Sequence, residues 1–351
     1  MIDDDTPEGA SVKWTRTDRK TTENLLNDYW SNISRDQEPE HPNSDNARNT
    51  ICNTVRAFMN KEGLGFSNED LGTLSSTVTA DEIWESIDMM PQGSAPGKNS
   101  LPTEHYKIHY DRNDTRTNGA EMIQLLSDVY AESEQGVNET DKVWPTTFRQ
   151  SLMRLIYKKS ESTDRVFKKN YRPITLQSIN YKIFYKALAN RLSKLIHKVI
   201  SYNQFAYIPG RVISDPIYMI KFIIQRARNH NSREAALFAD LAKAFDTVGH
   251  LFIEAILKAM GFPTRFISWV MMSFRKNEVQ IIVNGFLTEP YKPGAGGKQG
   301  DPLFPLIFIC VMLGLIALIE MDEGIAGVRL PFMDRILKIL AFADDATLFI
   351  G

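Results

Sequence analysis

Cysteine is almost absent from this sequence. The 351 residues include only Cys52 and Cys310, which lie far apart and outside any CxxC pattern or Cys/His cluster. This scarcity excludes a disulfide framework and a structural zinc site, and it favours a reducing compartment. The first residues, Met1-Ile-Asp-Asp-Asp5, are acidic and lack the apolar segment of a secretory signal peptide. We therefore expect an intracellular protein.

Long hydrophobic runs are also scarce, and only one raises the question of a membrane. Leu303 to Ile319 contains seventeen residues without a charge, but it includes Pro305 and Gly314 and is at the short limit for a membrane span. A helix buried in a protein core explains the run better, and a membrane-spanning helix is the alternative. The composition, 43% hydrophobic and 24% charged, is that of an ordinary globular protein. We expect no membrane partner.

Acidic residues are missing from one long stretch, Asn170 to Ser214. Over the wider segment 151–230 there are 16 lysines and arginines but only three acidic residues, although the formal net charge of the whole chain is −2. A basic segment within a near-neutral chain is the electrostatic footprint of a phosphate-lined partner. The alternative is a solvated helix face, which explains some of the lysines but not the complete lack of acids.

Two adjacent carboxylates stand out among the residues that are present. Asp344 and Asp345 interrupt two apolar, strand-forming runs, Ile339 to Ala343 and Ala346 to Ile350, which predicts a hairpin with the acids at its tip. The two charges repel, and a cation such as Mg²⁺, which prefers carboxylate oxygens, would relieve that repulsion. The alternative is a pair of solvated acids in a surface loop.

A third carboxylate would favour the metal-site interpretation, and the sequence provides one. Ala235 to Asp240 reads as a short buried strand that ends in Asp240. An uncompensated carboxylate in such a place is costly, so a cation partner is expected. Asp246 is the competing acid, but the turn after the strand displaces it, and we assign it a structural role.

Further elements follow from periodicity and from capping and turn signals. Thr79 and Glu82 form a capping box at the start of a helix. Asn284-Gly285 marks a hairpin within Glu278 to Thr288. Further helices are predicted at Asp45 to Met59, Gly119 to Glu132, Asn180 to Ile200, Asp215 to Arg228 and Leu251 to Met260; strands are predicted at Leu152 to Lys159 and Tyr171 to Leu176, separated by a polar turn at Ser160 to Asp164.

Within these elements, the helix from Asn180 to Ile200 is amphipathic. Its outward face is predicted to carry Lys182, Lys186, Arg191, Lys194 and Lys198. The Gly-rich loop from Pro293 to Pro305 fits neither the Walker nor the dinucleotide pattern. Such a loop lets a base pair approach the backbone closely, with Gln299 as a polar contact.

Taken in order, four motifs resemble those of the reverse transcriptases of LINE-type (non-LTR) retrotransposons. They are Tyr171-Arg-Pro-Ile174, Phe238-Ala-Asp-Leu-Ala-Lys-Ala-Phe-Asp246, Gly297-Lys-Gln-Gly-Asp-Pro-Leu-Phe-Pro305 and Phe342-Ala-Asp-Asp345. Three further segments are also typical of that family: Ala95-Pro-Gly-Lys-Asn-Ser-Leu-Pro102, which lies upstream, Lys182 to Leu192 and Gln204-Phe-Ala-Tyr-Ile-Pro-Gly-Arg211. The resemblance runs from about residue 71 to the end. It implies an α+β right-hand polymerase, of which the fingers and the palm are present, with an antiparallel palm sheet packed on helices.

The resemblance also implies a function and a set of site residues. Asp240, Asp344 and Asp345 would be the catalytic triad and would hold two Mg²⁺ ions, for which Mn²⁺ could substitute, during transfer of dNTPs onto a primer 3′-hydroxyl. Phe245 would be the steric gate that rejects ribonucleotides. The residues implied to bind dNTP are Lys158, Arg172, Phe245, Gln299 and Gly300. The implied partners are an RNA template, a DNA primer and dNTPs, and the implied location is the nucleus.

The sequence departs from the family pattern in three places. Phe304 stands where the family usually has Ser, and Lys98-Asn-Ser100 replaces Pro-Asp-Gly. The sequence ends at Gly351, six residues after Asp345, so we expect the thumb to be absent. The alternative function is therefore a truncated, non-catalytic remnant that at most binds nucleic acid. We predict a polar helical region at 1–70, a fingers extension at 71–140 and a fingers–palm domain at 141–351, and the sequence leaves the oligomeric state open.

Overall fold

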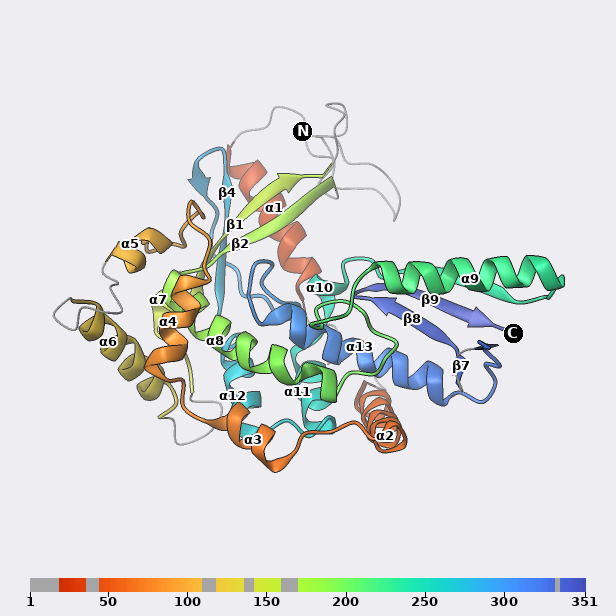
Figure 1. Cartoon of the computed structure of the whole chain (residues 1–351). Helices are drawn as coiled ribbons and strands as arrows, with labels where there is room; N and C mark the ends of the chain where they lie inside the picture. Colours follow the sequence, from red (N-terminus) through yellow and green to blue (C-terminus); the bar gives the residue numbers. More distant parts are fainter. Residues whose placement is uncertain (1–18, 36–43, 109–117, 136–141, 159–169, 332–334) are drawn as a thin grey trace. The chain divides into compact units, whose positions relative to one another are not determined.

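The computed structural model describes residues 19–35, 44–108, 118–135, 142–158, 170–331 and 335–351. The chain forms two compact units, each assembled from three separate stretches of sequence. Unit 1 comprises Met1–Asp36, Thr77–Ala187 and Ser268–Pro302; unit 2 comprises Gln37–Ser76, Leu188–Ile267 and Leu303–Gly351. Both units contain helices and strands, which confirms the predicted α+β class (Figure 1). The three-part division made from the sequence motifs stays a prediction.

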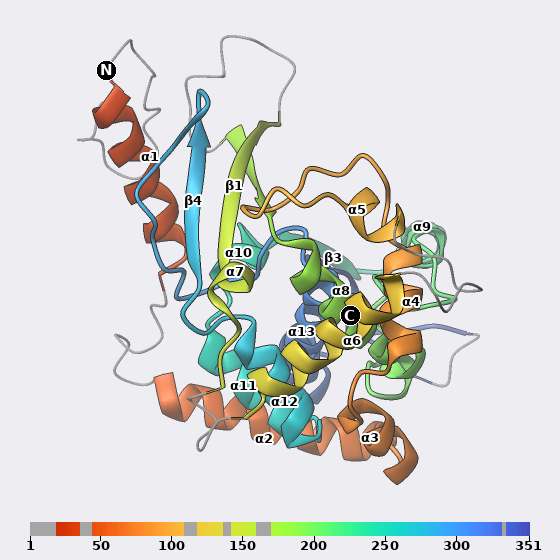
Figure 2. The same cartoon turned by 90° about the vertical axis from the view of Figure 1, so that its left-hand side faces the viewer.

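Unit 1 is built on a four-stranded sheet in the order β2-β1-β4-β5. The strands are β1 (Gln150–Tyr157), β2 (Tyr171–Leu176), β4 (Glu278–Val283) and β5 (Phe286–Leu287), and β1 is antiparallel to β2 but parallel to β4. Helix α1 (Arg19–Ile33) lies beside β4 (Figure 2) and buries Leu26 and Trp30 against Met153 and Ile281. Both predicted strands are confirmed, whereas the predicted polar turn at Ser160 to Asp164 lies outside the described residues.

The capping box and the hairpin turn predicted in unit 1 are both present. The Thr79 hydroxyl accepts a hydrogen bond from the Glu82 amide at 3.3 Å, and the Glu82 carboxylate accepts one from the Thr79 amide at 2.8 Å, which confirms the capping box. Asn284 and Gly285 both have positive φ, as a tight β4–β5 hairpin requires. Besides α1, the described helices of this unit are α4 (Ala80–Asp88), α5 (Thr103–Ile108), α6 (Asn118–Ser133) and α7 (Thr146–Arg149), with the first part of α8 (Ile179–Leu195) and the last part of α12 (Thr264–Met272).

Unit 2 contains the three-stranded antiparallel sheet that carries the acidic motifs. Its order is β3 (Ala235–Asp240), β9 (Asp345–Ile350) and β8 (Ile339–Phe342), and a separate two-stranded ribbon joins β6 (Val328–Arg329) to β7 (Ile336–Leu337). Helix α9 (Ser214–His230) lies along this sheet (Figure 1), and its Ile223 shares a buried cluster with Leu340 and Phe349. The helix predicted at Asp215 to Arg228 is therefore confirmed.

Strand β3 differs from the prediction in its burial. Leu237 is 56% exposed and Phe238 is 64% exposed, so the expectation of a buried strand is wrong. In the part of the chain that the structure describes, β3 is an edge strand that pairs with β9 alone. Ala236 packs against the cluster of α9, but the neighbouring apolar side chains of β3 remain open.

The long apolar run forms helix α13 (Phe304–Met321), which packs on α2 (Ser44–Glu62) and α11 (His250–Ala259). A Cβ atom at Gly314 would lie 3.2 Å from Ile51 and 3.4 Å from Ile256, so the missing side chain lets both helices approach. By length and hydropathy α13 is the one described helix that could cross a membrane, but 72% of it is buried inside the protein. The prediction of a buried core helix is confirmed, as are the helices predicted in the regions of α2 and α11.

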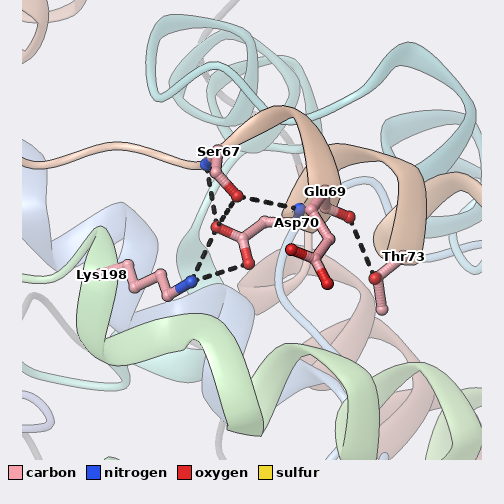
Figure 3. A network of polar contacts seen from close by, with 5 residues as sticks. All are labelled: Ser67, Glu69, Asp70, Thr73 and Lys198. Atoms are coloured by element: carbon pink, nitrogen blue, oxygen red, sulfur yellow. Dashed lines mark hydrogen bonds and ion pairs between the residues drawn. The ribbon is translucent and has the colours of Figure 1, made fainter.

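Several cations of the basic segment serve the fold of unit 2. Lys198 lies in the 3₁₀ helix Ile196–Lys198, which follows α8, and it donates to both carboxylate oxygens of Asp70 at 2.8 and 2.9 Å (Figure 3). The Ser67 amide donates to the same carboxylate. Asp70 lies in α3 (Asn68–Ser75), whose N-terminus it caps together with Ser67. Arg191 was expected on the outward face of α8, but it is buried and donates to the Ser76 carbonyl at 2.6 Å, so that expectation is wrong.

Candidate active site

The two acids of the hairpin occupy different positions in unit 2. Phe342 pairs with Asp345 at the end of the β8–β9 ladder, so Ala343 and Asp344 form the turn and Asp345 is the first residue of β9. The prediction of both acids at the tip is therefore correct for Asp344 only. Ala343 has a φ of +55° and is buried, although left-handed backbone is unfavourable for a residue with a side chain.

Asp240 completes the group of three acids. In the antiparallel β3–β9 ladder it lies directly opposite Asp345. Directly opposed residues point to the same face of a sheet, with Cβ atoms about 5 Å apart. The sheet therefore brings together Asp240 and Asp345 from two strands, with Asp344 next to them in the turn. Asp246, the competing acid, lies in the short helix α10 (Ala244–Thr247) and has no place in this ladder.

The surroundings of Asp344 disfavour its ionised form. Partial burial raises the pKa of Asp344, and the negative charges of Asp345 and Asp240 raise it further. A bound cation would reverse both effects, because it favours the ionised carboxylates. In the described residues no three acidic, histidine or cysteine side chains already stand in a ligating arrangement, so a metal ion would have to draw these carboxylates together.

Phe245 lies in α10 and is held by other aromatic rings of unit 2. Its ring stacks on Phe308 of α13, with centroids 4.0 Å apart and planes 16° apart. Phe304, at the position where the resemblance led us to expect Ser, contacts Phe245 edge-on with centroids 6.0 Å apart. Phe245 is half-buried as a result, so one part of a fixed ring remains open to solvent.

Lys158 and Arg172 lie together in unit 1. Arg172 is opposite Ile156 in the β1–β2 ladder, and two residues further along the Lys158 amide donates to the Asn170 carbonyl at 2.9 Å. Side chains two residues apart on a strand share a face, so both cations project from the same side of the ladder. Both are exposed, as a site for an anionic ligand requires.

Gln299 and Gly300 are also in unit 1, at the tip of the Gly-rich loop. The Thr175 amide of β2 donates to the Gln299 carbonyl at 2.9 Å. Gly300 has a φ of +107°, and a Cβ atom there would lie 3.3 Å from the Thr175 carbonyl oxygen. The loop tip is therefore bonded to the strand that carries Arg172, and only glycine suits its backbone.

The model of the family described as reverse transcriptase (RNA-dependent DNA polymerase) matches residues 156–351, more than half of the chain. The chain belongs to the reverse transcriptase family. The match includes every residue singled out above for the site, and the resemblance to LINE-type (non-LTR) enzymes is confirmed by the relatives that the chain matches.

These relatives are proteins of transposable elements. The chain is 28% identical over 275 residues to a transposon TX1 uncharacterized 149 kDa protein of Xenopus laevis, covering 78% of this chain and 20% of that protein. It is 29% identical over 180 residues to the retrovirus-related Pol polyprotein from type-2 retrotransposable element R2DM of Drosophila melanogaster, covering 51% of this chain and 16% of the polyprotein. A probable RNA-directed DNA polymerase from transposon BS of the same fly is 23% identical over 66% of this chain and 24% of its own length. The chain thus spans about a quarter or less of these three relatives.

Reverse transcriptases generally use divalent metals, and the donor set of this member suits them. The three aspartates offer only oxygen ligands, which hard cations such as Mg²⁺ and Mn²⁺ prefer. Partial burial, together with the charges of Asp345 and Asp240, raises the pKa of Asp344, and a bound cation would favour its ionised form. The residues present therefore fit the metal chemistry of the family.

Two sets of buried polar residues were not predicted from the sequence. Asn203 and Gln204, both fully buried, lie beside β8 in unit 2, and Gln204 bonds to the turn that precedes Asp344. In unit 1, Lys298 is buried 4.2 Å above the ring of Tyr181, whose hydroxyl donates to Asp301 at 2.6 Å. The sequence signal for these residues is that they are polar but are flanked by apolar residues or glycine. Hydrophobic periodicity assigns such residues to exposed loops, so it does not predict their burial.

Proposed function

We propose that this chain is the polymerase part of a non-LTR retrotransposon protein and catalyses RNA-directed DNA synthesis. The substrate would be a dNTP, and the acceptor would be the 3′-hydroxyl of a DNA primer paired to an RNA template. Unit 2 would be the palm and unit 1 the fingers. The names of the relatives support this reading, since one is called a probable RNA-directed DNA polymerase and others are retrotransposon polyproteins. An enzyme that copies RNA into chromosomes would act in the nucleus.

The observation that carries the proposal is the opposition of Asp240 and Asp345 beside the turn residue Asp344. Asp240, at the end of β3, and Asp344, in the turn before β9, would hold two divalent cations, and Asp345 would support the second site. When bound, these cations would activate the primer hydroxyl and neutralise the leaving pyrophosphate. Carboxylates from two paired strands suit this task, because the backbone hydrogen bonds of the sheet fix their spacing.

Other residues would bind and select the nucleotide. Lys158 and Arg172, exposed on one face of the β1–β2 ladder, would bind the triphosphate, for which the guanidinium fork is well shaped. Phe245, fixed by Phe308 and Phe304, would occupy the space of a ribose 2′-hydroxyl and so exclude ribonucleotides. The tip at Gln299 and Gly300 would contact the base pair through its backbone.

The test is primer extension on poly(rA)/oligo(dT) with Mg²⁺. Wild-type protein should extend the primer, and Asp344→Asn, which keeps the shape but removes the charge, should reduce the rate by about 100-fold or more. Asp128→Asn is the matched control, because Asp128 is an exposed acid on α6 in unit 1. Equal extension by wild type and Asp344→Asn would refute the metal site. If soluble, folded wild-type protein extends no primer, the chain has no polymerase activity of its own and the remnant reading holds.

A further inference from the structure

The segment around Gln204 pairs with β8, the first strand of the β8–β9 hairpin in unit 2, through an isolated β-bridge. The Phe205 amide donates to the Ala341 carbonyl at 2.9 Å, and the Ala341 amide donates to the Asn203 carbonyl at 2.8 Å, so Gln204 is bridged to Ala341 in parallel orientation. The segment therefore runs along β8 towards its turn. Arg211 donates to the carbonyls of Ser201, at 2.6 Å, and of Gln204, which anchors the segment from outside the sheet.

The Gln204 side chain forms hydrogen bonds with the backbone of Ala343 in the β8–β9 turn. The Ala343 amide donates to Gln204 Oε1 at 2.9 Å, and Gln204 Nε2 donates to the Ala343 carbonyl at 3.3 Å. Gln204 Oε1 also accepts a hydrogen bond from the Ala206 amide at 3.0 Å. A glutamine amide carries both a donor and acceptors, and so satisfies both backbone groups of one residue at once.

The residue that Gln204 holds is the strained one. Ala343 has a φ of +55°, which costs free energy for any residue with a Cβ atom, and it is buried. Such a conformation persists only when the surrounding structure determines it. The two hydrogen bonds between the Gln204 side chain and the Ala343 backbone hold Ala343 in this conformation. Ala343 directly precedes Asp344, so the orientation of their shared peptide bond sets the direction of the Asp344 side chain.

We propose that Gln204 is a positioning residue for Asp344: its side-chain amide holds Ala343 in the left-handed conformation and thereby aims the Asp344 carboxylate at the metal site. The inference rests on the proposed function for its catalytic consequence but not for its structural one. Glutamine suits the role because asparagine is shorter by one methylene group and leucine would leave the buried Ala343 amide unpaired.

The structural consequence can be measured without metal or substrate. Amide hydrogen exchange at Ala343 should become at least about tenfold faster in Gln204→Leu, because the amide loses its acceptor. The control Gln225→Leu removes the same group from the exposed face of α9, where Gln225 bonds only to Asn229 among the contacts described, and should leave exchange at Ala343 unchanged.

A second control separates positioning from general stability. Asn203 donates to the Ile339 carbonyl at 2.7 Å and to Glu320 at 2.9 Å, at the far end of β8. Asn203→Ala should therefore lower the melting temperature. When the two variants are compared under conditions of equal global stability, the Ala343 amide should exchange more slowly in Asn203→Ala than in Gln204→Leu. Equal loss of protection in both variants would overturn the proposal. If Gln204→Leu does not fold, Gln204→Glu keeps the acceptor and loses the donor, and it should show an intermediate increase in exchange.

The catalytic consequence is a split between kcat and KM. Gln204→Leu should lower kcat by about 10- to 100-fold, the effect of a misplaced catalytic group, while KM for dNTP stays within about twofold. Mn²⁺ affinity, measured by electron paramagnetic resonance, should fall as well. Because glycine adopts positive φ without strain, adding Ala343→Gly to Gln204→Leu should recover part of kcat.

The outcomes distinguish this proposal from the proposed function. If the wild type does not extend primers, the proposed function fails, and hydrogen exchange and Mn²⁺ affinity still judge the role of Gln204. If the wild type is active and Gln204→Leu keeps its kcat and its Mn²⁺ affinity, Gln204 does not position Asp344.

Discussion

Asp240 and Asp345 are register partners in the β3–β9 ladder, so two carboxylates share one face of one sheet. Together with burial, their charges raise the pKa of Asp344 above its ordinary value of 3.8. A carboxyl group whose pKa is raised by folding stabilises the protein below its unfolded-state pKa and loses that contribution as the pH rises through the folded value. At neutral pH the ionised Asp344 is therefore a cost to the metal-free protein.

We expect Asp344→Asn to raise the melting temperature of the metal-free protein at pH 7, although the same variant should be impaired in primer extension. The gain should disappear at pH 3, where the wild-type carboxyl group is protonated in both the folded and the unfolded state. Millimolar Mg²⁺ should raise the melting temperature of the wild type but not of the variant, because only the wild type binds the ion in its folded state. Differential scanning fluorimetry at the two pH values measures all three effects, and a lower melting temperature for Asp344→Asn at pH 7 would contradict the argument.

Phe245→Val should relax the discrimination against ribonucleotides by about tenfold or more, because a smaller side chain leaves room for a 2′-hydroxyl. The ratio of kcat/KM for dTTP to that for UTP, on the same poly(rA) template, gives the value. Phe252→Val, which alters a half-buried aromatic residue of α11 rather than α10, serves as the matched control. An unchanged ratio in Phe245→Val would show that the ring belongs only to the core cluster with Phe308.

Arg172→Ala should raise KM for dNTP by about tenfold, the cost of losing a charge-assisted contact to phosphate, with a smaller effect on kcat. Arg172→Lys should be intermediate, since lysine retains the charge but lacks the bidentate fork. Steady-state kinetics at saturating template and primer separate the two parameters. Lys292→Ala removes an exposed cation from the same unit and should leave KM as it is. An unaltered KM in Arg172→Ala would limit Arg172 to a role in the fold.

The Asp70–Lys198 pair gives a pH dependence of the opposite sign. Its hydrogen bonds, above all those from Lys198, lower the pKa of Asp70 to about 2. An acid whose pKa is lowered by folding stabilises the protein at pH values above its unfolded-state pKa, here 3.8. This contribution is lost as the pH falls towards the folded-state pKa of about 2. Asp70→Asn should therefore melt at a lower temperature than the wild type at pH 7, and the two curves should converge between pH 4 and pH 2.

The control for this pair is an ordinary surface ion pair. Lys258 and Glu254 are separated by one helical turn of α11, and the Lys258 side chain is 58% exposed, so Lys258→Met should change the melting temperature little at any pH. Parallel curves for Asp70→Asn and the wild type over the whole acid range would mean that the carboxylate does not contribute through its charge.

Elements with a strong local signal could be predicted from the sequence. The capping box at Thr79, the hairpin turn at Asn284-Gly285 and the buried helix α13 depend on interactions within a few residues, or on a run of apolar side chains that no surface could tolerate. The three aspartates could be singled out because each interrupts or ends a strand-forming run, and their role as a metal site stays a prediction. In these places local preference and tertiary structure agree.

What the sequence could not reveal depends on partners far away in the chain. Leu237 and Phe238 have the composition of a buried strand, but their exposure depends on the edge position of β3. Arg191 follows the outward period of its helix, yet it reaches the carbonyl of Ser76, 115 residues earlier. Gln204 meets Ala343 across 139 residues. No periodicity in a window of one helix or strand contains these contacts.

The interleaving of the two units has a consequence for how the protein is made on the ribosome. Unit 1 cannot be completed until Ser268–Pro302 has been synthesised, and unit 2 needs Leu303–Gly351 as well. Domains usually fold one after another as they emerge, but here the early segments of both units must wait for partners that are translated much later. During that interval the apolar faces of α2 and α9 are without their sheet and helix neighbours. We therefore expect nascent chains to depend on chaperones, and chains released before residue 303 to aggregate.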